Sequence, residues 1–232
     1  MIRSLFLTLA VGTFAMTAHA NEAEDRRARS IAILEAEGIP YLDSLPLIET
    51  EKTALRRSEE EIVQRAIALA IVAVKGETGD HALGLALIDQ FDADGFFSPD
   101  ELAYLNDPDP DEQTHINFIW RYESAYVMLW ALGFYDDLGQ PADIVDVGQM
   151  AGLLRDLGTE GLRREGRLRP QSEILDAADL IYRYNWAAVN ARVNGKPPPE
   201  GVNPSVTYER HYALNWLIGY LDQAWDDIST DT

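Results

Sequence analysis

The sequence predicts an all-α protein, a single-domain helical bundle of about seven to nine helices in which three long helices form the core. Apolar residues recur three and four residues apart in several long segments, as expected for helices with one buried face. No stretch alternates apolar and polar residues between turn signals, as a half-buried strand would. Capping residues, glycines and prolines mark where the helices start and stop.

The N-terminal region is expected to contain two helices joined by an arm. An amphipathic stretch covers residues 22–37, and residues 43–50 form a connecting arm. Ser58 and Glu61 then have the spacing of a capping box, which predicts the start of a helix with an apolar stripe. Gly76 is the expected end of that helix.

Two short helices are expected on either side of the loop at 91–97. The first covers residues 81–90. The second begins at Ser98, where a serine cap is followed by Pro99 at the first helical position and by Glu101 at the third. This combination is typical of a helix start.

The three long core helices are expected at 112–132, 171–194 and 204–221. Glycine or proline follows the first two, and an Asn-Pro pair opens the third. A shorter helix at 144–157, ending at Gly158, is expected between the first and second.

Composition and charge favour a soluble globular protein and argue against nucleic acid as a partner. The chain has 232 residues, 47% of them hydrophobic, no cysteine and a net charge of −20. Such a surface repels phosphate and anionic lipid. The largest basic patch is the one place where an anion could dock, and we favour a solvated patch that balances nearby acids. The patch comprises Arg163, Arg164, Arg167 and Arg169.

The first twenty residues have the pattern of a secretory signal peptide. A positive start at Arg3 precedes an apolar run, and Ala18 and Ala20 form a cleavage site after Ala20. The run is shorter than the roughly 20 residues of a membrane span. We therefore expect a periplasmic or secreted protein without a membrane partner, with a signal peptide at 1–20.

Several stretches of the chain resemble the family called domain of unknown function 4272. They are LRRSEEEIVQRAIAL (55–69), FFSPDELAYL (96–105), WRYESAYVMLWALG (120–133), RPQSEILDAADLIYRYNWA (169–187), YERHYALNWLIGY (208–220) and WDDISTDT (225–232). The resemblance implies a helical domain over residues 55–232, preceded by an N-terminal helix and arm at 21–54. It implies no substrate, because the family has no assigned activity. An export signal is not part of the family's core pattern.

Charged residues within the apolar stripes are the most informative positions, and we call them the polar core cluster. Burying an unpaired charge costs several kcal/mol, on the order of the effective penalty per ion in proteins. These side chains should therefore pair with one another or line a water-filled cleft. The cluster comprises Glu123, Asp179, Arg183, Glu209, Arg210 and the neighbouring His211.

The choice between pairing and a cleft decides the class of function. Mutual pairing, which the balanced signs favour, makes the cluster a structural network. A cleft would let Glu123 or Glu209 act as acid or base with assistance from His211, while Arg183 or Arg210 holds an anion. No serine, cysteine or second histidine stands at a spacing typical of nucleophilic catalysis.

The tryptophans are expected to form an aromatic core. Most of them lie on the long helices at helical spacing, where a large aromatic ring is usually buried rather than used to stack on a ligand. The five are Trp120, Trp130, Trp186, Trp216 and Trp225.

The loop at 90–101 resembles part of an EF-hand. Asp92, Asp94 and Glu101 match loop positions 3, 5 and 12, but position 1 is then the neutral Gln90. The capping box at Ser98 explains the same glutamate, so calcium is the alternative to a simple helix start.

Zinc and other cofactors are not expected. After cleavage the chain has no thiol, and only three histidines remain, which are His81, His115 and His211.

The sequence favours a non-enzymatic binding or interaction module with an unidentified protein or small-molecule partner. The first alternative is a hydrolase-type enzyme that uses Glu123, Glu209 and His211 with an arginine as anion holder. The second is a calcium-binding structural module at residues 90–101.

Overall fold

The computed structural model describes the backbone of residues 10–232 and the side chains from residue 22 onward. Every regular element in this part of the chain is helical, so the all-α prediction is confirmed. The α-helices are α1 (Ala10–Glu37), α2 (Glu59–Thr78), α3 (His81–Phe91), α4 (Pro99–Asn106), α5 (Glu112–Ile119), α6 (Arg121–Ala131), α7 (Val147–Glu165), α8 (Gln171–Val193) and α9 (Pro204–Ile218), followed by the short 3-10 helices η1 (Tyr220–Asp222) and η2 (Trp225–Asp227).

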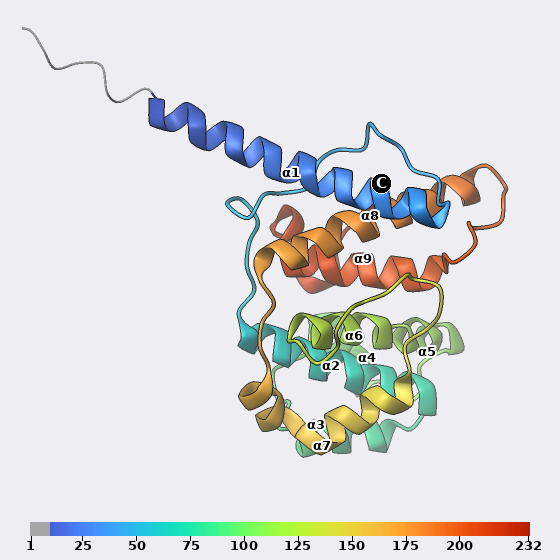
Figure 1. Ribbon diagram of the computed structural model, residues 1–232. Helices are drawn as coiled ribbons and strands as arrows, with labels where there is room; N and C mark the ends of the chain where they lie inside the picture. Colours follow the sequence, from blue (N-terminus) through green and yellow to red (C-terminus); the bar gives the residue numbers. More distant parts are fainter. Residues whose placement is uncertain (1–9) are drawn as a thin grey trace, which may run out of the picture.

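The helices are stacked in layers, as Figure 1 shows. α1 packs on α8, α8 on α9, α9 on α6, and α6 on α2. α3 and α7 lie against α2 at the opposite end of the stack from α1, and α5 also packs on α2. Helices that lie in neighbouring layers, such as α1 and α8 or α6 and α9, are therefore often far apart in the sequence.

α2 is the central helix of the lower layers. Its residues 66–73 are all buried, because other helices cover it on several sides. A helix that is apolar around its whole circumference is stable only inside a core. Each buried leucine, isoleucine or valine contributes about 1.5 to 3 kcal/mol relative to an exposed side chain.

Both predicted capping boxes are present. The Ser58 side chain accepts from the Glu61 amide at 3.2 Å, and the Glu61 carboxylate accepts from the Ser58 amide at 2.8 Å. The same reciprocal pair at Ser98 and Glu101 opens α4. These local signals set helix starts independently of the tertiary packing.

The predicted end of α2 at Gly76 is wrong. The helix continues to Thr78, and Gly79 with a φ of 65° forms its left-handed C-cap. A Cβ atom on Gly76 would lie 2.9 Å from the His115 carbonyl oxygen. Gly76 therefore serves the close approach of α2 and α5 rather than a helix end.

The expected helix at 112–132 is divided into α5 and α6 at Trp120. There the Glu123 amide donates to the Trp120 carbonyl three residues back. The break lets α5 lie along α2 while α6 lies between α2 and α9. Packing on two different surfaces, which periodicity does not report, accounts for the division.

The helix expected at 144–157 also differs. It begins at Val147, capped by Asp146, three residues later than expected. Gly158 has a non-helical φ of 57° and ψ of −174°, so the first part of α7 ends there as expected, and a second helical segment follows across this kink to Glu165. The last long helix ends three residues earlier than expected, at Ile218, because Gly219 forms a left-handed cap with a φ of 67°.

The expected signal peptide at 1–20 lies partly outside the described residues, and none of its side chains is described. Residues 1–9 are not described, and the expected cleavage point after Ala20 lies in the part of α1 for which only the backbone is described. In the described portion, none of the helices has the length and apolar character needed to cross a bilayer.

Candidate functional site

The polar core cluster is buried at the interfaces of three helices. Glu123 lies on α6, Asp179 and Arg183 on α8, and Glu209 and Arg210 on α9, with His211 next to them. Each of the six side chains belongs to a residue that is at most 5% exposed. Their contacts show how these buried charges are paired.

Glu123 and Arg210 form an ion pair between α6 and α9. Arg210 Nε lies 3.0 Å from Glu123 Oε2. Glu123 Oε1 accepts from the Val145 amide at 2.5 Å, and Arg210 Nη1 donates to the Leu138 carbonyl at 2.6 Å. The pair therefore fixes the loop between α6 and α7 as well as the two helices.

Asp179 and Arg183 form a pair within α8, one turn apart. Arg183 Nε and Nη2 donate to the two carboxylate oxygens at 2.8 and 2.9 Å. The acid precedes the arginine, which is the favourable order on a helix. A two-point contact of this kind is stronger and more specific than a single charge contact.

Glu209 pairs with Arg121, a residue that the sequence analysis did not single out. Arg121 Nη1 lies 3.0 Å from Glu209 Oε2, and the Ser124 hydroxyl donates to the same oxygen at 2.8 Å. Burial raises the pKa of Glu209, although Arg121 and Ser124 act in the opposite direction. The Arg121 guanidinium also lies 4.7 Å from the ring centroid of Tyr212. The only sequence signal for this group of contacts was the three-residue spacing of Arg121 and Ser124, which places both side chains on one face of α6.

His211 borders a cavity of about 290 Å³, which we call the His211 cavity. Its walls come from the arm at 45–49, from α8 and α9, and from the C-terminal residues. The polar residues of the wall are Glu49, Tyr182, His211, Asn215, Tyr220, Asp231 and Thr232. The His211 Nδ1 atom has no hydrogen-bond partner in the described structure. Burial lowers the pKa of His211 to about 4, despite the nearby charge of Asp231.

A second cavity, of about 250 Å³, lies between α2, α3 and α7, and we call it the α2–α7 cavity. Its wall is mostly apolar. The lining residues are Ile67, Ala70, Ile71, Val74, Leu87, Gln90, Phe91, Tyr122, Met150, Ala151, Leu154 and Arg155.

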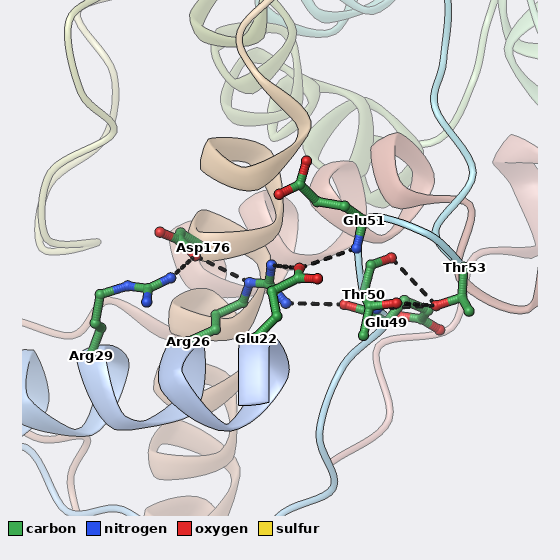
Figure 2. A network of polar contacts seen from close by, with 8 residues as sticks. All are labelled: Glu22, Arg26, Arg29, Glu49, Thr50, Glu51, Thr53 and Asp176. Carbon is green, nitrogen blue, oxygen red and sulfur yellow. Dashed lines mark hydrogen bonds and ion pairs between the residues drawn. The ribbon is translucent and has the colours of Figure 1, made fainter. Parts of the chain in front are cut away.

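The ion-pair network around Arg26, near the N-terminus, was not anticipated. Figure 2 shows Arg26 of α1 between Glu22 and Asp176, with the arm beside it. Arg26 contacts the Glu22 carboxylate at 2.5 Å, the Asp176 carboxylate at 3.1 Å and the Glu49 carbonyl at 3.1 Å. Its partners lie on three segments, so α1 is joined to α8 and to the arm. Sequence spacing reveals only the pair with Glu22, four residues away.

Lys75 is another buried charge that the sequence analysis missed. Its ammonium donates to the carbonyls of Tyr104 at 2.6 Å, Leu105 at 3.2 Å and Asp107 at 2.6 Å. These are carbonyls at the end of α4, where a cation is stabilised by the helix dipole. Burial nevertheless lowers the pKa of Lys75. Lys75 thus has a structural role as a cap supplied by another helix.

The three candidate calcium ligands, Asp92, Asp94 and Glu101, have different environments in the structure. Asp92 is the left-handed C-cap of α3, with a φ of 50°. Glu101 is buried and pairs with Arg65 at 2.6 Å. Asp94 is exposed. Nowhere in the described residues do three or more His, Asp or Glu side chains lie close enough to hold a metal ion.

The basic patch is largely occupied by acids and carbonyls. Arg163 contacts Glu60 and Glu160, and Arg164 contacts Glu165. Arg167 donates to the Arg164 and Gly166 carbonyls. Arg169 donates to the Trp130 and Asp136 carbonyls and pairs with Glu173. The interpretation of a patch that balances nearby acids agrees with these contacts.

Four of the five tryptophans lie in the hydrophobic core or pack against it. Trp130, Trp216 and Trp225 are buried, and Trp186 is half-buried and packs against the core. Trp120 departs from the expected aromatic core: it is half-buried and outside the core cluster. Its position at the break between α5 and α6 removes it from the helix face that its spacing predicted.

Together, the fold and these contacts define an all-α domain whose helix interfaces contain buried ion pairs. Residues 26–228 match the family described as domain of unknown function DUF4272, and the chain belongs to this family. The match begins within α1 and therefore includes the arm as well as the later helices. No curated protein and no solved structure matches the chain.

Proposed function

We propose that this chain is a non-enzymatic binding or interaction module whose buried ion pairs stabilise the helix interfaces. The observation behind this proposal is that the buried acids Glu123, Asp179 and Glu209 each pair with an arginine. A general acid or base must come within hydrogen-bonding reach of a substrate. Within the described part of the chain, neither these acids nor Arg183 and Arg210 line the two cavities named above.

The hydrolase alternative depends most strongly on Glu209. Burial raises the pKa of its carboxyl group, a property suited to a general acid. However, Arg121 and Ser124 both hold its Oε2 atom. His211, two residues after Glu209 on α9, lines a cavity whose wall does not include Glu209. This separation favours a structural role for the carboxylate.

A substitution of Glu123 tests the structural role. Glu123→Ala leaves Arg210 buried without its partner, and breaking a buried pair in this way costs about 3 to 5 kcal/mol of unfolding free energy. Urea denaturation measures this loss. The matched control is Glu160→Ala, which removes an ion pair whose glutamate is 81% exposed. That change should alter stability by less than about 1 kcal/mol.

Activity provides the opposing test. The purified protein should hydrolyse none of a panel of ester, phosphate and glycoside substrates. Turnover that disappears in Glu209→Gln, while the variant unfolds at the same urea concentration as the wild type, would contradict the proposal and favour the hydrolase.

We also propose that the protein is exported and acts in the periplasm or outside the cell, free of the membrane. The pattern of residues 1–20 supports this location. Mass spectrometry of protein from separated cell fractions should find a chain that begins at Asn21 outside the cytoplasm. A full-length chain confined to the cytoplasm would refute export.

A further inference from the structure

The α2–α7 cavity combines an apolar interior with a polar mouth. Ile67 and Ile71 of α2 and Leu154 of α7 are buried and form part of its wall. Gln90, Ala151 and Arg155 line the same cavity and are exposed. An apolar cavity is poorly hydrated, and apolar molecules of fitting size enter such cavities readily.

Arg155 is the one charged residue among those that line the cavity in the described structure. Among the described residues, its guanidinium pairs with the carboxylate of its neighbour Asp156, at 3.2 Å, and both side chains are 72% exposed. Exposed pairs of this kind contribute little free energy, so a competing anion can replace Asp156. The guanidinium presents a planar fork that matches the two oxygens of a carboxylate.

The volume limits the size of the apolar part of a ligand. A cavity of about 150 Å³ accommodates benzene, with its six carbon atoms. By proportion, the 250 Å³ of the α2–α7 cavity corresponds to about ten carbon atoms.

We infer that the α2–α7 cavity binds an amphiphile with one carboxylate and an apolar chain of about ten carbons. The chain lies against α2 and α7, and the carboxylate contacts Arg155 at the mouth. This inference rests on the proposed binding function and deepens it by naming the class of ligand.

The methionines of the chain offer a local probe of binding. Met150 lines the cavity, whereas Met128 is fully buried on α6 and does not. The protein is labelled with ¹³C at the methionine methyl groups and titrated with decanoate. The Met150 signal should shift to saturation while the Met128 signal stays in place, with Met150→Leu identifying the signal.

The head group is tested with a neutral ligand of equal length. Decan-1-ol should bind about two- to fivefold more weakly than decanoate, because it lacks the contact with Arg155, and an ion pair at an exposed arginine adds only this modest factor. Arg155→Gln should reduce the affinity for decanoate to that for decan-1-ol. Its matched control is Arg164→Gln, since Arg164 is also exposed on α7 and paired with its neighbour, Glu165.

The cavity itself is tested by filling its mouth. Ala151→Phe should abolish the Met150 shift with both ligands. Gln149→Phe places the same ring on an exposed position of α7 outside the cavity lining and should leave binding unchanged.

Three results would overturn the inference: no Met150 shift at millimolar decanoate, equal affinity for the two ligands, or equal effects of the two arginine substitutions. None of them bears on the proposed function, because that proposal fails only if Glu123→Ala leaves stability unchanged or if turnover depends on Glu209.

Discussion

His211 is a buried base without a hydrogen-bond partner at Nδ1, and it is only 2% exposed. The charge of Asp231 favours protonation but does not compensate for the lost hydration, so the pKa of His211 falls to about 4. In the unfolded chain a histidine has a pKa near 6.5. The folded protein therefore keeps this imidazole neutral over a pH range in which the unfolded chain protonates it.

This difference predicts a pH dependence of stability. Because the unfolded state binds more protons, the free energy of unfolding falls as the pH decreases from about 6.5 to about 4. The histidine should account for a loss of up to about 3 kcal/mol. Urea denaturation from pH 8 to pH 4 measures the loss, and the His211→Gln variant should show a flatter profile. Parallel profiles for the two proteins would show that His211 does not cause the dependence.

At the scale of the element, α7 depends on a single glycine for its kink. Gly158 adopts φ 57° and ψ −174°, a backbone region that is accessible essentially only to glycine. No other atom lies within 4 Å of a Cβ at this position, so backbone strain alone opposes a side chain there. At Gly152, in the same helix, a Cβ would make an ordinary van der Waals contact with Arg155 Nη2 at 3.8 Å, and the residue has no positive φ.

Alanine at these two glycine positions should have opposite effects on the free energy of unfolding. Gly158→Ala should lower the free energy of unfolding by about 1 to 3 kcal/mol, because the kink forces the new side chain into a strained conformation. Gly152→Ala should raise it by up to about 1 kcal/mol through helix propensity. Thermal and urea unfolding of both variants measure the changes. A stabilised Gly158→Ala variant would mean that the kink relaxes into a regular helix.

At the scale of the whole molecule, Arg26 is a buried charge that joins α1 to the rest of the fold. Arg26 is 1% exposed and joins α1 to α8 and to the arm, as Figure 2 shows. Arg29 contacts the same Asp176 carboxylate at 2.6 Å, but its side chain is 54% exposed. The two arginines therefore differ in burial while sharing a partner.

Arg26→Met should loosen α1 and the arm without unfolding the core. A lost hydrogen bond to a charged group costs about 1.5 to 3 kcal/mol, so amide hydrogens of the arm should exchange about tenfold faster or more. Hydrogen exchange with mass spectrometry measures this rate, and peptides from α2 provide the internal reference. Arg29→Met should change exchange much less. Equal acceleration in the two variants would refute the special role of Arg26.

Local sequence signals were sufficient for much of the fold. The capping boxes at Ser58 and Ser98, and the pair of Asp179 with Arg183, lie within four residues of chain and formed as predicted. Arg121 with Glu209 could not be predicted, because the two residues are 88 positions apart. Periodicity shows that a charge falls on a buried face, but it does not show which helix lies opposite.

The sequence by itself determined the helical class, most helix starts and the burial of the polar core cluster, because capping and periodicity act within one or two helical turns. Only the tertiary structure decided which charges pair, where α5 separates from α6, and which residues surround the two cavities. Those features depend on how helices distant in the sequence are packed, and both the buried ion pairs and the α2–α7 cavity exist only where several helices meet.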